Sequence, residues 1–257
     1  MKAKKIVVLS MAVAFVFVAI LSCFRIFSVR GVEIDFTVYK NTDVKMVQQT
    51  ADSFKGKSLL FLKTDEVKEE LSKFSYVEVL SVEKDYPNVL KIKVKERREV
   101  YYTEVNGKYY ILDQDGFVLN CVEQDALGDL REKIALSFSN VKIEKLEVGS
   151  YIKTDCDSLL KSTFKMAKCV DLTDCIKSIK IDSKIPLYNV AFTTYTGVEI
   201  WVVRAEDDGE AKIKKAFAVY ESDISDYKKA FDTLIVSKSR IDGTIHVDWS
   251  DRSEIGK

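Results

Sequence analysis

Residues able to do chemistry are sparse in this chain of 257 residues. His246 is its one histidine and would have to be the base of any Ser-His-Asp or Cys-His arrangement, yet no Gly-x-Ser-x-Gly sequence accompanies it. The sequence also lacks a glycine-rich phosphate loop and an HExxH sequence, and none of its 40 acidic residues stand out as a catalytic pair. We therefore expect no catalytic residue and no cofactor.

The cysteines give little further indication of a functional site. The five lie at positions 23, 121, 156, 169 and 175, with no CxxC pair, so we expect no metal site. A scattered cysteine beside apolar residues is most often a small core residue. Disulfides among Cys121, Cys156, Cys169 and Cys175 stay an open alternative, with Cys169 and Cys175 the closest pair in sequence.

His246 lies in a segment with the period-two pattern of a half-buried strand. The pattern has two alternating faces, with Thr244, His246 and Asp248 outward and Ile245, Val247 and Trp249 inward. The segment is short and comes last, so we expect it near the edge of a sheet. A proline at His246 is then predicted to remove an edge donor.

The amino-terminal region predicts a membrane anchor. No charge interrupts residues 6–24, and roughly 20 apolar residues in a helix span a bilayer core. Lys2, Lys4 and Lys5 precede this stretch, so residues 1–5 are expected in the cytoplasm and the rest outside. The alternative is a lipoprotein signal, in which Cys23 of Ile20-Leu21-Ser22-Cys23 carries the lipid. Because 40 basic residues balance 40 acidic ones, the charge gives no support for nucleic-acid binding.

Residues 74–97 carry the most regular pattern in the chain. Leu90, Ile92 and Val94 alternate with lysines, and Pro87 marks a turn before them. An earlier strand with one irregularity runs through Val77, Val79 and Val82. Two helices are expected upstream, one begun by Thr42 and Asp43 and one capped at Thr64 that runs to Phe74. With a first strand at 32–39, the order is βααββ.

These residues resemble the POTRA domain of the FtsQ/DivIB bacterial cell-division family. The resemblance rests on Tyr76-Val77, Pro87, the alternating segment 90–94 and Glu96-Arg97. Tyr76 stands where tryptophan is common, and Glu99 where the family often has proline. The resemblance implies an α+β protein with one amino-terminal transmembrane helix at 6–24, a POTRA domain at 29–97, a mixed β-sheet domain with helices at 98–250, and a tail at 251–257.

In the second domain, Asn106-Gly107 predicts a hairpin between strands at 101–105 and 108–112. We expect residues 120–145 to be rich in loops. Helices are predicted at 155–169, 210–220 and 226–235, strands at 176–181, 190–194 and 198–202, and a last strand at 243–249.

The resemblance implies a non-catalytic, single-pass scaffold at the division septum. Its partners would be FtsB/DivIC-type and FtsL-type proteins and, indirectly, the FtsW and FtsI synthesis pair. The implied docking site is the last strand, which comprises Thr244, Ile245, His246, Val247, Asp248 and Trp249, used by β-strand addition. A membrane-anchored surface lipoprotein that binds a ligand or envelope component is the alternative. A POTRA-bearing outer-membrane translocation protein would need a long carboxy-terminal barrel, for which the chain is too short.

Overall fold

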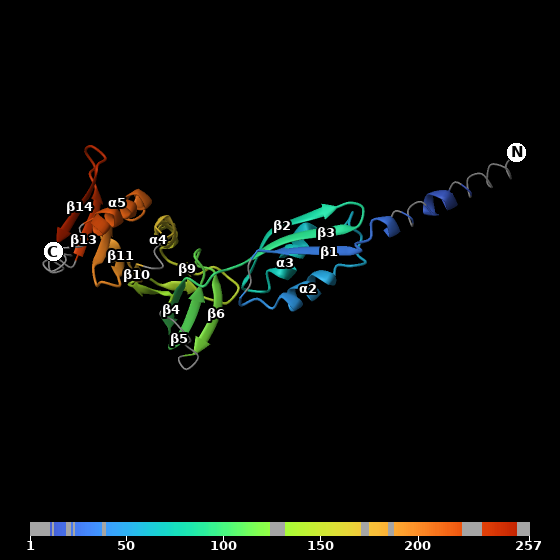
Figure 1. Cartoon of the computed structure of the whole chain (residues 1–257), viewed down its shortest axis with the longest axis horizontal. Helices are drawn as coiled ribbons and strands as arrows, with labels where there is room; N and C mark the ends of the chain where they lie inside the picture. The colour runs from blue at the N-terminus through green and yellow to red at the C-terminus, as the bar shows by residue number, and fades with distance from the viewer. Residues whose placement is uncertain are drawn as a thin grey trace. The chain divides into compact units, whose positions relative to one another are not determined.

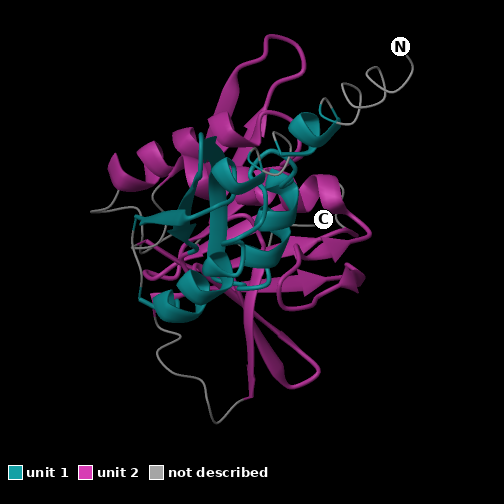
Figure 2. Cartoon of the chain, turned by 90° about the vertical axis from the view of Figure 1, so that its right-hand side faces the viewer, with its two compact units in different colours: residues 1–97 teal, residues 98–257 magenta. Residues whose placement is uncertain are grey.

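The computed structural model describes residues 11, 13–18, 22, 24–37, 40–123, 132–170, 175–184, 188–222 and 233–250. The chain divides between Arg97 and Arg98 into two compact units (Figure 1; Figure 2). Both units combine helices with a sheet, so the predicted α+β class is confirmed.

After helical residues between positions 11 and 26, the described part of unit 1 is a three-stranded sheet with two helices packed on it (Figure 1). Its elements are β1 (Gly31–Phe36), α2 (Val44–Asp52), α3 (Thr64–Leu71), β2 (Val77–Asp85) and β3 (Val89–Glu96). The predicted βααββ order is confirmed. Strand β3 lies in the centre, parallel to β1 and antiparallel to β2.

The side chains of β3 follow the predicted alternation. Leu90, Ile92 and Val94 are at most 1% exposed and belong to the core beneath the helices. Lys91 and Lys93 are exposed on the other face. The irregularity predicted in β2 is a shift of register between Val79 and Ser81.

The helix starts are only partly as predicted. Asp43 caps α2, because its carboxylate accepts the backbone N–H groups of Lys45 at 3.0 Å and Met46 at 3.2 Å. The prediction that Thr64 caps α3 is wrong: Thr64 is already helical, and the cap position is Lys63, which makes no side-chain capping bond. Helix α3 also ends at Leu71, before the predicted Phe74.

Unit 2 is built around a mixed sheet that has nine strands within the described residues. Their order across the sheet is β14-β13-β12-β11-β10-β7-β4-β5-β6, and helices α4 and α5 pack on its core side chains (Figure 1). The elements are β4 (Tyr101–Val105), β5 (Lys108–Leu112), β6 (Val118–Glu123), β7 (Ile134–Ser139), β8 (Ile143–Lys145), β9 (Lys153–Thr154), α4 (Asp157–Cys169), β10 (Ile176–Asp182), β11 (Tyr188–Thr194), β12 (Glu199–Val203), α5 (Gly209–Ser222), β13 (Thr233–Lys238) and β14 (Ile245–Ser250).

The hairpin predicted at Asn106-Gly107 is confirmed. Strands β4 and β5 pair antiparallel on either side of it. Asn106 has φ 54° and Gly107 has φ 74°, the left-handed conformations that a two-residue hairpin turn needs.

Two predictions for unit 2 are wrong. Residues 120–145 hold the end of β6 and all of β7 and β8, and β7 pairs with β10 and β4 in the sheet. Residues 233–235, predicted as the end of a helix, begin β13, because this segment pairs with β12 and β14. Residues 226–232 of that predicted helix lie outside the described residues.

The terminal predictions are largely untested by the structure. Within the described residues, we find no helix of the length and apolar character needed to cross a bilayer. The predicted tails 1–5 and 251–257, much of the predicted span 6–24, and Cys23 of the lipoprotein alternative lie outside the described residues.

Candidate partner-binding edge

Strand β14 forms one end of the nine-stranded sheet of the described residues (Figure 1). Five of the six predicted site residues, Ile245 to Trp249, belong to β14, and Thr244 directly precedes it. Within the described residues no strand pairs with the outer side of β14, so its predicted position at an edge of the sheet is confirmed.

The two faces of β14 differ as the alternation predicts. Ile245, Val247 and Trp249 are partly buried against the core of unit 2. His246 and Asp248 are exposed on the other face, and His246 Nε2 lies 2.8 Å from Thr244 Oγ1. The apolar face thus holds β14 on the sheet and leaves its polar face open to solvent.

The pairing of β14 with β13 decides which backbone groups face the edge. Ser239 N–H donates to Thr244 C=O at 2.8 Å, and the antiparallel register continues from this pair. Antiparallel pairs alternate between hydrogen-bonded and non-hydrogen-bonded. His246, opposite Ser237, therefore directs its backbone groups toward β13, whereas Val247 directs its N–H and C=O away from it.

This hydrogen-bonding pattern contradicts the prediction made for a proline at His246. A proline at His246 was predicted to remove an edge donor, but the N–H of His246 faces β13 and belongs to the hairpin. The alternation of side chains reports only the faces of a strand. The in-plane direction of each N–H depends on the register with the neighbouring strand.

A lysine that the sequence did not single out reaches the same edge. Lys215 of α5 donates its ammonium group to the backbone C=O of Ile245. This contact agrees with the hydrogen-bonding pattern of β14, because the backbone groups of Ile245 point away from β13, as those of Val247 do. The carbonyl keeps a second lone pair, so an incoming N–H can still bond to it.

The turn before β14 is held by a carboxylate. Asp242 accepts the backbone N–H of Thr244 at 3.1 Å and its hydroxyl at 2.8 Å. Hydrogen bonds from Ser239 and Thr244 lower the pKa of Asp242 to about 2. Gly243 follows with φ 73°, and Ile241 at the tip is 98% exposed. An Asp-Gly pair is a turn signal that a reading of the sequence could have used.

Strand β13 is tied to the loop before α5. Lys238 forms an ion pair with Asp208, which lowers the pKa of Asp208 and raises that of Lys238. Lys212 is 1% exposed and donates to Val203 C=O at 2.9 Å and to Arg204 C=O at 3.1 Å. Burial lowers its pKa, and the bonds to backbone carbonyls satisfy its ammonium group.

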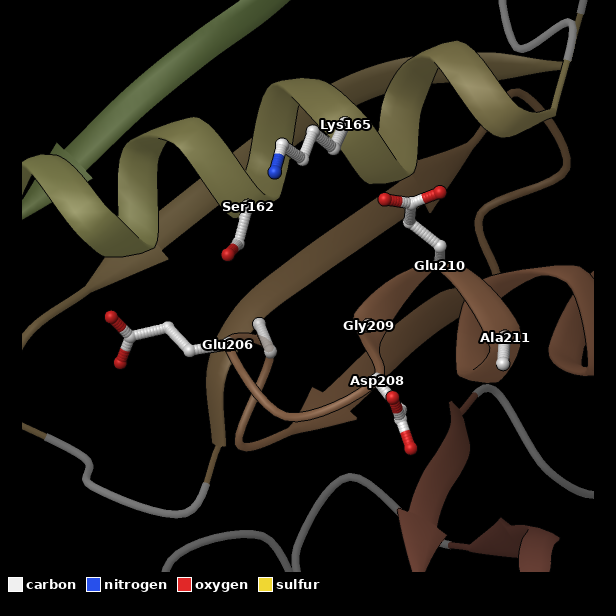
Figure 3. A pocket seen from close by; sticks show the side chains of 8 residues that line it. Ser162, Lys165, Glu206, Asp208, Gly209, Glu210 and Ala211 are labelled. Carbon is white, nitrogen blue, oxygen red and sulfur yellow. The ribbon is translucent and has the colours of Figure 1, made fainter.

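A polar cavity of about 390 Å³ lies beside that loop and α4 (Figure 3). Ser162 and Lys165 line it from α4, and Glu206 and Asp208 extend to different sides (Figure 3). Among the described residues, no group of three or more His, Cys, Asp or Glu side chains is placed to share a metal ion.

All four cysteines outside the predicted span are free thiols in the structure. Cys169, at the end of α4, donates its thiol to Glu210 at 3.0 Å. Burial, followed by the bond to Glu210, raises the pKa of Cys169. Burial also raises the pKa of Cys156. In both thiols the pKa shift is opposite in direction to the one that activates a cysteine nucleophile.

A βααββ unit followed by a mixed sheet with an open last strand defines a POTRA-bearing protein with an additional β domain. Residues 27–97 match the family model described as POTRA domain, FtsQ-type.

The chain is 24% identical over 202 residues to the cell division protein DivIB of Clostridium tetani, covering 77% of this chain and 72% of that protein. It is 23% identical over 158 residues to DivIB of Clostridium botulinum (strain Hall), covering 62% of this chain and 59% of that protein. It is 25% identical over 81 residues to the cell division protein FtsQ of Rickettsia felis, covering 32% and 30%. The chain thus contains an FtsQ-type POTRA domain and is similar to the cell division proteins DivIB and FtsQ.

Proposed function

We propose that this protein is a non-catalytic scaffold of bacterial cell division that binds an FtsB/DivIC-type partner as an added strand along β14. The FtsQ-type POTRA domain and the names of the relatives support the role in division. The outward backbone groups of Val247, at the end of a sheet, are the observation that carries the mode of binding.

The edge is suited to this mode because its partner-facing groups are held in place. Ile245 and Val247 pack their side chains on the core, which fixes the strand without using its outward N–H and C=O groups. His246 and Asp248 present polar side chains beside them and would set the register of the added segment. Lys215, already at the Ile245 carbonyl, would favour a segment that carries an acidic side chain there.

The proposal places the protein in the cell membrane with residues 6–24 as its anchor and both units outside the cytoplasm. Through the bound partner and an FtsL-type protein, the scaffold would reach the FtsW and FtsI synthesis pair at the septum. A reporter fused after Lys257 is then expected to be active only outside the cytoplasm. Activity of a cytoplasmic reporter would refute this topology.

The edge is tested with two substitutions at one position. Val247→Pro removes the outward N–H and places a ring where an added strand must lie, yet proline is tolerated on the solvent side of an edge strand. Val247→Ala is the matched control, because it trims the side chain and keeps the N–H. We expect the proline variant to lose at least about tenfold in affinity, roughly the worth of one to two hydrogen bonds, and the alanine variant to bind normally.

The measurement is co-purification and titration of the FtsB/DivIC-type partner with each variant, alongside a thermal melt. His246→Pro serves as a contrast: it removes a donor to β13 and should lower the melting temperature. Normal affinity of Val247→Pro with a normal melt would exclude strand addition at β14. The interface would then lie elsewhere, for instance at β6, the opposite end of the described sheet.

A further inference from the structure

Apolar side chains that unit 1 leaves exposed gather at one end of its sheet. Phe24, Leu60, Phe61 and Tyr86 are exposed around the half-buried Phe27, and we call these five residues the aromatic collar. Phe61 is 71% exposed, Tyr86 54%, Phe24 48% and Leu60 43%. Phenylalanine and leucine are usually buried, and a group of them on the surface of a small domain commonly marks an interaction site.

The collar is an ordered cluster. The rings of Phe24 and Phe61 stack with centroids 5.8 Å apart. The rings of Phe27 and Tyr86 meet edge to face with centroids 6.0 Å apart. Lys84 donates to the Leu60 carbonyl at 3.5 Å, which joins the end of β2 to the same group. The cluster is thus built by three segments of the chain.

Backbone hydrogen bonds hold those three segments together. Leu59 N–H donates to Phe27 C=O at 2.6 Å, so the connection between α2 and α3 is joined to the segment that enters β1. Arg30 N–H donates to Asn88 C=O at 2.8 Å, which joins that segment to the turn between β2 and β3. The collar therefore surrounds the point where the chain enters the sheet of unit 1.

The position of the collar along the chain indicates its occupant. Phe24 is the last residue of the uncharged stretch 6–24, and Phe27 follows three positions later. Arg25 and Arg30, both exposed, lie beside them, and Arg30 donates to the Arg25 carbonyl at 3.4 Å. Aromatic rings and arginines at the end of an apolar helix match the chemistry of the bilayer interface, where rings lie among headgroups and guanidinium groups meet phosphates.

We propose that the aromatic collar is a membrane-contact surface by which unit 1 rests on the outer face of the bilayer that residues 6–24 span. This rests on the anchor that the proposed function assigns to those residues. With the collar in the headgroup layer, the β2–β3 turn and the α2–α3 connection face the lipid. The opposite end of the sheet, where β1 ends at Phe36, faces away from the membrane.

The test places single tryptophans in the full-length chain, reconstituted alone into phosphatidylcholine nanodiscs with or without bromine on the acyl chains. Phe61→Trp and Tyr86→Trp report on the collar and are tolerated because both positions are exposed. Met46→Trp, in the first turn of α2 and 53% exposed, is the matched control, and Val16→Trp reports on the anchor. The quenching of the native tryptophans, measured on the unsubstituted chain, is subtracted.

Bromine is expected to quench the added fluorescence of both collar variants and to leave that of Met46→Trp unchanged. Quenching of Val16→Trp with none at the collar would overturn the collar proposal and leave the anchor standing, and a membrane-embedded protein partner would become the occupant. Absence of quenching at all positions would overturn both the anchor and the collar. Equal quenching at Met46→Trp would also overturn the proposal, because contact would then not be specific to the collar.

Discussion

The Ile92→Ala substitution tests the register on which unit 1 is built. Ile92 is 1% exposed in the central strand β3, opposite Ile34 of β1 and Val82 of β2. Alanine lacks three of its side-chain carbons, which at ~0.8 kcal/mol each is about 2.4 kcal/mol of lost burial. The cavity left between two flanking strands adds to this, so we expect a loss of about 3–4 kcal/mol in the free energy of unfolding.

Hydrogen exchange measured by mass spectrometry on the full-length chain is the suitable assay, since peptides from each unit are read separately. Where exchange follows the unfolding equilibrium, 3–4 kcal/mol speeds exchange in β2 and β3 by about a hundredfold to several hundredfold. Peptides of unit 2 should not change. Lys93→Ala, one residue along the strand and exposed, should shift stability by less than about 0.5 kcal/mol. Equal and small effects at both positions would refute the register.

Two further predictions concern titrating groups. Asp242, whose pKa is lowered to about 2 by bonds from Ser239 and Thr244, stabilises the turn fully above its unfolded pKa of about 3.9, and this contribution is lost as the pH falls toward 2. The Thr244 amide resonance should therefore titrate near pH 2 and lose this titration in Asp242→Asn; a midpoint near 3.9 would contradict the hydrogen bonds. Glu210→Gln should lower the pKa of Cys169 and speed its alkylation by iodoacetamide at pH 8, because it removes the negative charge beside the thiol. An unchanged rate, followed by mass spectrometry, would show that burial alone sets this pKa.

Unit 1 was largely predictable because its signals are local. The alternation of β3 reports one buried face whichever strand pairs with it, and Pro87 lies in the turn that joins β2 to β3. Asp43 caps its helix through bonds that span only three residues. The local pattern did not give the bounds of α3. Thr64 resembles a capping residue but lies inside α3, where Asp65 and Glu66 supply the negative charge of the first turn.

In unit 2 the secondary-structure predictions fail where pairing between strands that are distant in sequence decides the structure. Strand β7 is short, and its place between β10 and β4 comes from segments about 40 residues away on one side and about 30 on the other. Residues 233–235 carry Thr, Leu and Ile, which fit either a helix or a strand until β12 and β14 are present to pair with them. Propensity over so few residues is too weak to choose between the two states.

In β14, one feature can be predicted from the local sequence and another depends on the pairing with β13. The inward and outward side chains of β14 follow from period two alone, so their faces could be read from the sequence. Whether His246 or Val247 offers its N–H to a partner depends on one bond, from Ser239 to Thr244, which sets the phase of the whole β13–β14 ladder. A register shifted by one residue would reverse that phase and would also turn Ile245, Val247 and Trp249 away from the core. The turn, held by Asp242 and Gly243, therefore decides which backbone groups the edge presents to a partner.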